Sequence, residues 1–189
     1  MAETIKIALA GEGGQGVQSV AGILVEAAND EGREALYIPN FGVEQRGGVS
    51  VAFCQISDEK VGSPKFQYAD LVVALSDRAV RRTRQYANKN TLYIYDSSIK
   101  GVENELPKDA KKVLGIPALE TAKKELHPRV FNIIIMGAAI EATKVVGMEQ
   151  AKKAVEKRLG YKFAQKPELR ELNYKALERG AELVKKSLA

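Results

Sequence analysis

A glycine-rich stretch near the start of the chain is the first candidate for chemistry. Gly11, Gly13 and Gly16 match the spacing G-x-G-x-x-G between an apolar run and a helical pattern. Glycines at these positions allow a tight turn and a close approach of backbone N–H groups to a ligand. The following helix would direct its free N-terminal N–H groups at the same point. The stretch predicts a phosphate-binding loop, and a turn that needs glycine only for its shape is the alternative.

The residues after the next strand bear on the class of phosphate ligand. A nicotinamide dinucleotide site carries Asp or Glu there, roughly 20 residues on, to hold the adenosine ribose. Here the run ALYIP over 35–39 is followed by Asn40 and Phe41, without an acid. The sequence therefore favours a nucleotide-like ligand that does not require this acid.

A second loop carries charge beside flexible backbone. The stretch PNFGVEQRGGVSVAFCQIS over 39–57 places Gly47 and Gly48 directly after Glu44, Gln45 and Arg46. An arginine guanidinium can bind an anion through two parallel hydrogen bonds. A hairpin-like loop that needs glycine to re-enter a strand is the alternative, but such a loop does not require an exposed charged triplet. We expect the two loops to share one site.

Together these stretches resemble the gamma subunit of the 2-oxoacid:ferredoxin oxidoreductases, a family with pyruvate, 2-oxoisovalerate, 2-oxoglutarate and indolepyruvate enzymes. The resemblance runs in order through nearly the whole chain. At Glu12 the family usually has arginine, and an acid at the mouth of a phosphate loop would repel an anion unless it points away. The matching segments are GEGGQGV at 11–17, FGVEQRGG at 41–48, IS at 56–57, SP at 63–64, AD at 69–70, YDSS at 95–98 and N-x-x-x-x-G at 132–137.

The resemblance implies a role inside a larger complex. In this family thiamine diphosphate, bound by the alpha and beta parts, decarboxylates a 2-oxoacid, and [4Fe-4S] clusters on a delta or beta part pass the electrons to ferredoxin. Coenzyme A accepts the acyl group, and the gamma part resembles the domain that helps to bind coenzyme A. The implied partners are the alpha, beta and delta subunits, with thiamine diphosphate, Mg and [4Fe-4S] only on them.

The predicted site combines both loops and contains no catalytic residue and no metal ligand. Backbone N–H groups of the first loop would hold a phosphate of coenzyme A, and the second loop would face it. Among the oxoacids 2-oxoglutarate is slightly favoured, because the chain is short and carries EQRGG. A stand-alone Rossmann-like nucleotide-binding protein or NAD-dependent dehydrogenase is the alternative. The site residues are Gly11, Gly13, Gly14, Gln15, Gly16, Gln45, Arg46, Gly47 and Gly48.

Four further features have simpler interpretations. Cys54 lies mid-strand and is expected to be a buried small hydrophobe rather than a nucleophile. His127, before Pro128, is expected in a surface loop, and Asn132 is expected to cap a helix rather than to contact a ligand. The arginines of 77–87 predict a solvated helix face, with a phosphate or subunit contact as the alternative.

The elements that position these residues alternate between strands and helices. Strands separated by helices predict a three-layer α/β/α sandwich with a mostly parallel sheet. One antiparallel strand is expected, because 35–39 and 49–56 are joined only by a loop and a parallel crossover needs about a dozen residues. Strands are expected at 5–10, 35–39, 49–56, 71–75, 91–95 and 113–114, and helices at 16–31, 77–87, 118–125, 131–145, 148–158 and 168–186.

Composition limits the class of protein. The 189 residues, 45% hydrophobic, predict one globular domain over 1–189, and a single cysteine excludes an internal disulfide. The net charge of +5 comes from 151–189, where 11 Lys or Arg face 5 Asp or Glu. Because these charges are interleaved on amphipathic helices, we expect a solvated face rather than a nucleic-acid surface. No segment predicts a membrane span or a signal peptide, so a cytoplasmic protein is expected.

Overall fold

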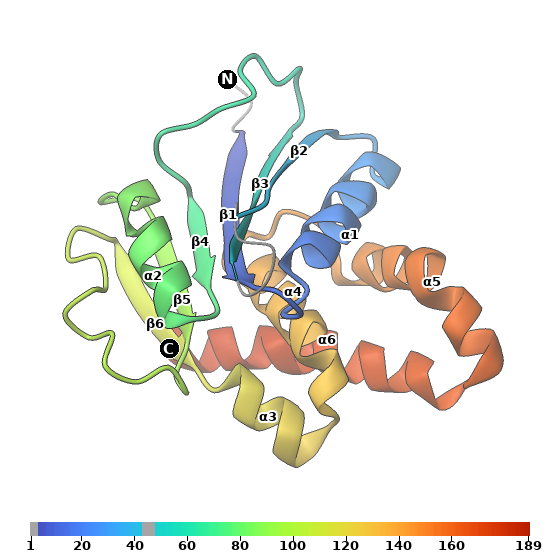
Figure 1. Cartoon of the computed structure of the whole chain (residues 1–189). Helices are drawn as coiled ribbons and strands as arrows, with labels where there is room; N and C mark the ends of the chain where they lie inside the picture. The colour runs from blue at the N-terminus through green and yellow to red at the C-terminus, as the bar shows by residue number, and fades with distance from the viewer. Residues whose placement is uncertain (1–3, 43–47) are drawn as a thin grey trace.

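The computed structural model describes residues 4–42 and 48–189 (Figure 1). Its centre is a six-stranded sheet in the order β2-β3-β1-β4-β5-β6. The strands are β1 (Ile5–Glu12), β2 (Glu34–Asn40), β3 (Val49–Ser57), β4 (Leu71–Ala74), β5 (Leu92–Asp96) and β6 (Lys112–Ile116). The helices are α1 (Val17–Asp30), α2 (Asp77–Thr83), α3 (Ala118–Glu125), α4 (Phe131–Thr143), α5 (Met148–Gln165) and α6 (Glu168–Leu188), with 3-10 turns η1 (Arg84–Tyr86) and η2 (Pro128–Val130).

One strand runs against the others. β1, β4, β5 and β6 are parallel, whereas β3 pairs antiparallel with both β1 and β2. The predicted antiparallel strand is therefore confirmed. The register places Val49, at the start of β3, opposite Glu12, at the end of β1. The base of the second loop consequently lies beside the glycine loop.

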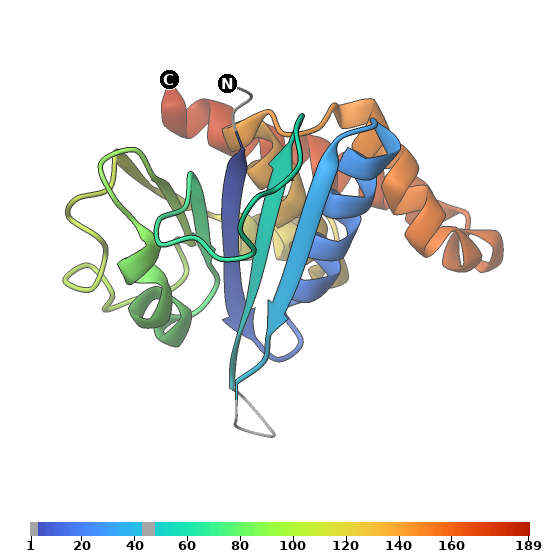
Figure 2. The same cartoon turned by 90° about the horizontal axis from the view of Figure 1, so that it is seen from above.

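Helices pack on both faces of the sheet, as the predicted three layers require (Figures 1 and 2). Successive side chains of β1 point to opposite faces. Ile7 and Leu9 join a large core with α1, α4 and α6, while Ala8 and Ala10 join a smaller core with α2. Both faces of the central strands are thus removed from water.

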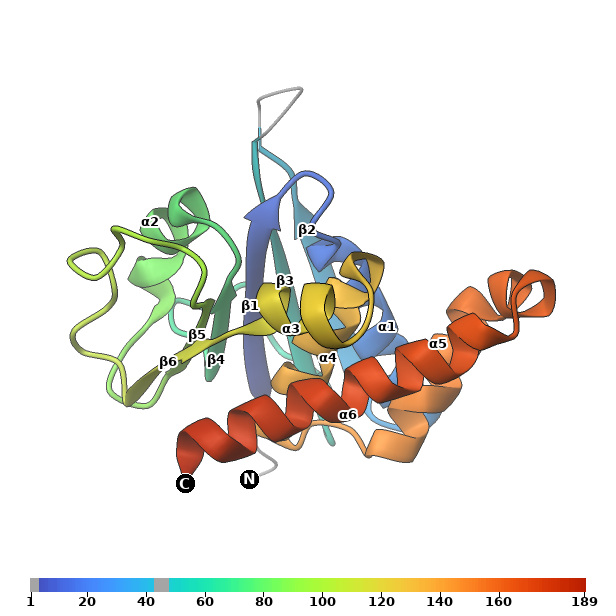
Figure 3. The ribbon, with the colours of Figure 1, turned by 90° about the horizontal axis from the view of Figure 1, so that it is seen from below.

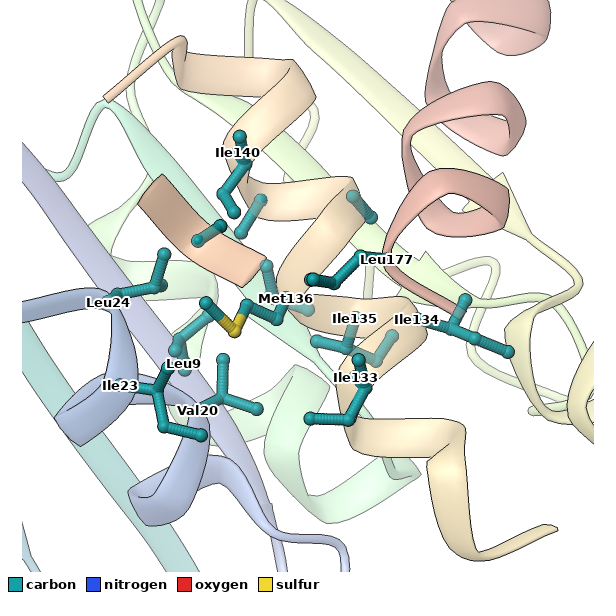
Figure 4. Close-up of a cluster of buried hydrophobic side chains, with 14 of the residues drawn as sticks. Leu9, Val20, Ile23, Leu24, Ile133, Ile134, Ile135, Met136, Ile140 and Leu177 are labelled. Atoms are coloured by element: carbon teal, nitrogen blue, oxygen red, sulfur yellow. The ribbon is translucent and has the colours of Figure 1, made fainter. Parts of the chain in front are cut away.

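Helix α4 is the buried centre of the larger layer. Its isoleucines 133, 134 and 135 and Met136 are almost fully buried, between α1 and the sheet on one side and Leu177 of α6 on the other (Figure 4). Figure 3 shows α6 crossing the molecule next to α4. A helix that is apolar on all sides is typical of such an interior position.

Glycines allow α4 and α6 to cross closely. A Cβ atom built on Gly137 would lie 1.9 Å from the carbonyl oxygen of Leu177, and one built on Gly180 would lie 1.9 Å from the carbonyl oxygen of Ile134. Each helix therefore presents a glycine to the backbone of the other. Because α4 also begins at the glycine loop, this crossing helps to position the site.

Two helix ends differ from the sequence-based expectation by more than two residues. The helix expected over 77–87 ends at Thr83 and continues as the 3-10 turn η1. The helix expected to end at 158 continues to Gln165, because Phe163, 2% exposed, packs into the core from the extra turns. In η1, the ring of Tyr86 contacts the ring of Phe53 in β3 edge to face, with centroids 5.3 Å apart.

Within residues 4–42 and 48–189, no helix is both long and apolar enough to cross a membrane.

Candidate functional site

The glycine loop connects the carboxyl end of β1 to the first turn of α1. Gly14 and Gly16 have φ angles of 92° and 76°, a region that side chains with a Cβ rarely adopt. Gly13 and Gly14 are exposed, and their N–H groups donate no hydrogen bond within the described part of the chain. The first N–H groups of α1 also lack acceptors in their own helix. The loop thus presents several free donors to solvent.

Gln15 holds this loop in shape. Its side-chain Nε2 donates to the carbonyl oxygen of Leu75 at 2.8 Å, and its Oε1 accepts from the N–H of Glu12 at 2.7 Å. Its own N–H donates to the carbonyl oxygen of Glu12 at 3.1 Å. Gln15 therefore ties the end of β1 to the end of β4, and its donors are used inside the protein.

The first turn of α4 meets the first turn of α1. A Cβ atom on Gly16 would lie 2.9 Å from Cβ and from Nδ2 of Asn132. The predicted N-cap role of Asn132 is wrong, because Val130 caps α4 and Asn132 lies inside the first turn. The Asn132 side-chain amide makes no hydrogen bond within the described residues. Two helix N-termini and one free amide therefore converge on the glycine loop.

The glycine loop lies between two neighbouring strands, β1 and β4, whose following helices pack on opposite faces of the sheet. From β1 the chain passes through α1 on one face, whereas from the neighbouring strand β4 it passes through α2 on the other face. Ligands of open α/β sheets bind at such a point, outside the carboxyl ends of the strands. The topology therefore supports the position that the glycine spacing predicts.

A basic pocket adjoins this edge of the sheet. It has a volume of about 530 Å³ and is lined by three arginines of α2 together with Gly42, Gly48 and Val49. Arg81 pairs with Asp77 of its own helix at 3.1 Å, and Arg82 has no carboxylate within ion-pair distance in the described residues. The arginines of this helix are exposed, so the predicted solvated face is confirmed, and three of them also line a pocket at the carboxyl edge of the sheet.

The predicted second loop lies largely outside the described residues. Gln45, Arg46 and Gly47 belong to that part, so their predicted place in the site stays a prediction. Gly48 borders the basic pocket, and a Cβ atom on Gly42 would lie 3.3 Å from its Cα atom. The two ends of the loop therefore approach each other beside the arginines.

The strand pairing also gives the direction of Glu12. Alternation along β1 puts Glu12 on the same face as Ala8 and Ala10, which is the face of α2. The acid is thus directed to the arginine side of the sheet.

A family model described as pyruvate ferredoxin/flavodoxin oxidoreductase matches residues 6–183. The chain belongs to this family. The family match includes the glycine loop, the second loop and α2, so it covers every part of the candidate site.

Similar proteins of the family are named after three different oxoacids: ketoisovalerate, 2-oxoglutarate and pyruvate. The chain is 32% identical over 97% of its length to ketoisovalerate oxidoreductase subunit VorA of Methanothermobacter thermautotrophicus, and it spans 37% of that relative. It is 32% identical to 2-oxoglutarate synthase subunit KorC of Methanothermobacter marburgensis, with 95% and 96% of the two chains covered. It is 29% identical to pyruvate synthase subunit PorC of Thermotoga maritima, with 93% and 92% covered.

Solved structures of the family share the fold. The gamma subunit of a keto/oxoacid ferredoxin oxidoreductase from Geobacter sulfurreducens matches with a TM-score of 0.79 and 29% identity, over 96% of this chain and 99% of that one. A 2-oxoglutarate:ferredoxin oxidoreductase from Magnetococcus marinus matches with a TM-score of 0.87 and 24% identity, over 97% of this chain and 31% of that one. In some members, the part equivalent to this chain is thus a segment of a longer chain.

Cys54 and His127 lie apart from this site. Cys54 is fully buried in β3, where burial raises the pKa of its thiol to about 12. His127 is exposed, and its Nδ1 accepts a hydrogen bond from the N–H of Arg129 at 3.1 Å. The predictions of a core cysteine and a surface histidine are confirmed.

Because Cys54 is buried, its thiol is expected to react slowly with alkylating reagents. Only the thiolate reacts with alkylating reagents. In the folded protein, burial disfavours the negatively charged thiolate of Cys54 and also keeps the reagent away from its sulfur. We expect iodoacetamide at pH 8 to modify Cys54 at least about 1,000-fold more slowly in the native protein than in guanidinium chloride, since reaction requires global opening. Mass spectrometry of timed samples measures both rates. Comparable rates would contradict the buried position.

Proposed function

We propose that this chain is the gamma subunit of a 2-oxoacid:ferredoxin oxidoreductase and that it helps to bind coenzyme A. One observation carries the coenzyme A assignment: free N–H groups of the glycine loop and the arginine pocket lie at the same carboxyl edge of the sheet. Coenzyme A carries a pyrophosphate and a 3′-phosphate, so it needs more than one anion-binding group. The glycine loop would hold one phosphate group and the arginines another.

The proposal assigns the reaction itself to partner subunits. Thiamine diphosphate, Mg and [4Fe-4S] clusters would be on alpha, beta and delta parts, and ferredoxin would accept the electrons through them. The residues of this chain would bind and orient the acyl acceptor while the partners form the acyl group. The loops at the glycine edge would therefore face the thiamine-binding parts of the complex.

The names of similar proteins support the assignment to the 2-oxoacid:ferredoxin oxidoreductases, and they are the basis on which one oxoacid is proposed as the substrate. The Magnetococcus marinus structure has 2-oxoglutarate, coenzyme A and succinyl-CoA bound. We propose 2-oxoglutarate as the substrate, since the KorC relative matches this chain nearly end to end at 32% identity. The NAD-dependent alternative is not favoured, because β2 ends in Pro39 and Asn40 without the acid that would hold a ribose.

Arg82 offers a direct test of the phosphate contact. In the assembled complex, Arg82→Gln is expected to raise the KM for coenzyme A about tenfold, the loss of one charge-assisted hydrogen bond. The KM for the oxoacid should not change. Steady-state kinetics with each substrate varied in turn measures both constants.

A neighbouring arginine provides the matched control. Arg84 is also exposed but pairs with Glu105 and does not line the pocket. Arg84→Gln should therefore leave the KM for coenzyme A at its original value. An unchanged KM in the Arg82 variant, with the complex intact, would remove the arginine pocket from the proposed site.

A further inference from the structure

A hollow lies where α5 and α6 join, next to the 3-10 turn η2, and it is lined mainly by residues of these three elements. Figures 1 and 3 show that the joined ends of α5 and α6 extend beyond the sheet. The hollow has a volume of about 410 Å³ and shares no lining residue with the arginine pocket. Ligand pockets usually measure about 300–1,000 Å³, so this volume suits a single ring with a short side arm.

The walls of this hollow are mainly apolar. Phe163 of α5 is 2% exposed and Val130 of η2 is 3% exposed, so both belong to the core. Leu159, Leu169 and Leu172 are half-buried and pack against the same core. Because these side chains offer no hydrogen bonds, they favour an apolar ring over a polar group.

One buried polar side chain also lines the hollow. Asn173 is 6% exposed, and its Nδ2 donates to the carbonyl oxygen of Leu169 at 2.7 Å. Within residues 4–42 and 48–189, nothing donates to its Oδ1. No fully buried side-chain oxygen of the described residues lacks a partner, so this Oδ1 lies on the small part of Asn173 that solvent reaches. It is therefore an acceptor that a ligand in the hollow can use.

Three cations surround the opening of the hollow. Arg129, Lys162 and Lys166 line it and are exposed. In the part of the chain that the structure describes, none of the three forms an ion pair with a carboxylate. Glu168 is the one acid among the described lining residues. The hollow is thus apolar inside and positive at its opening, which complements an anion with an apolar body.

We propose that this hollow binds an aryl carboxylate whose ring carries a hydroxyl group. The ring lies against Phe163 and the leucines, and its hydroxyl group donates a hydrogen bond to Oδ1 of Asn173. The carboxylate stays at the opening, where Arg129 can bind it through two parallel hydrogen bonds and the lysines add positive charge. Each part of the ligand therefore matches one feature of the hollow. The site is additional to the proposed binding of coenzyme A.

Two related acids test the contact with Asn173. Isothermal titration calorimetry of the full chain, residues 1–189, compares 3-(4-hydroxyphenyl)propionate with 3-phenylpropionate, which lacks only the hydroxyl group. The hydroxylated acid should bind about fivefold more tightly, the usual effect of one neutral hydrogen bond. Asn173→Leu removes the acceptor, so this variant should bind both acids with equal affinity.

Two lysines of α5 test the contact with the carboxylate. Lys162→Glu should weaken the binding of both acids at least about fivefold, because a negative charge then stands at the opening. Lys153→Glu is the matched control. Lys153 is exposed on the same helix and makes no ion pair among the described residues, but it does not line the hollow. Its substitution changes the net charge equally and should leave both affinities unchanged.

Several results would overturn the proposal. The site is refuted if neither acid binds, and the Asn173 contact is refuted if the original chain binds both acids equally. Equal weakening by Lys162→Glu and Lys153→Glu would place the carboxylate elsewhere. If thermal melting shows that Asn173→Leu is misfolded, Leu172→Trp decides: it fills the hollow, so abolished binding supports the site and retained binding contradicts it. If Leu172→Trp folds but no longer assembles with partner subunits, the hollow is a subunit contact and the proposal fails.

Discussion

Gly137→Ala is expected to lower the free energy of unfolding by about 3 kcal/mol, the upper end of the usual cost of overpacking a core. The added methyl group would lie 1.9 Å from the carbonyl oxygen of Leu177. This neighbour is backbone, so no side-chain rotation relieves the overlap, and α6 must move away from α4. The melting temperature should fall by roughly 6–12 °C for a chain of this size. Gly180→Ala should have a similar effect, because its overlap with the carbonyl oxygen of Ile134 is equivalent.

A glycine in another helix provides a control that separates the effect of close packing on stability from the effect of helix propensity. Gly160 lies inside α5, and a Cβ atom there would meet only Glu156 Oε1, at 3.8 Å. Gly160→Ala should therefore stabilise the protein by about 0.5–1 kcal/mol, the usual gain from alanine in a helix interior. Denaturant unfolding monitored by circular dichroism measures all three variants. If Gly137→Ala were as stable as Gly160→Ala, the close crossing of α4 and α6 would be refuted.

The second large effect is expected for Gln15→Glu. The substitution nearly preserves shape but replaces the Nε2 donor with a carboxylate oxygen that faces the carbonyl oxygen of Leu75. It also adds a negative charge to a loop that is proposed to hold a phosphate. We expect the KM for coenzyme A to rise at least about tenfold in the assembled complex, since one hydrogen bond is lost and a charge opposes the ligand. Initial rates at varied coenzyme A and saturating oxoacid measure the change.

A second glutamine carries the same substitution as a control. Gln67 is exposed and lines a separate pocket with Thr4 and Lys6, near the start of β1. Gln67→Glu adds the same charge at the opposite end of the strand and should leave the KM for coenzyme A unchanged. Equal constants for the two variants would show that the glycine loop does not contact the ligand.

Local sequence patterns predicted most of the elements. Alternating apolar residues and glycine positions are properties of neighbouring residues, so they indicate strands, helices and the turn after β1 without any knowledge of the fold. They also predicted the antiparallel strand, because the connection before β3 is too short for a parallel crossover. The helix ends at Thr83 and Gln165 were missed because packing against distant residues determines them.

The site was predictable only in part for the same reason. Spacing alone identified the glycine loop, but the role of Gln15 depends on Leu75, which is 60 residues away. The prediction for Asn132 failed because a helix-capping preference is local, whereas its contact with Gly16 arises from the packing of α4 beside α1. Gln45, Arg46 and Gly47, and the single domain over 1–189, stay predictions.

By itself, the sequence predicted the glycine loop between β1 and α1, the mixed sheet and the resemblance that the family match confirmed. Only the tertiary structure decided which residues meet at the edge of the sheet. It brought the arginines of α2 to the base of the second loop, directed Glu12 to their side and placed Asn132 against Gly16. The physical reason is that strand order and helix crossing set these long-range contacts. No spacing within a single segment encodes either of them.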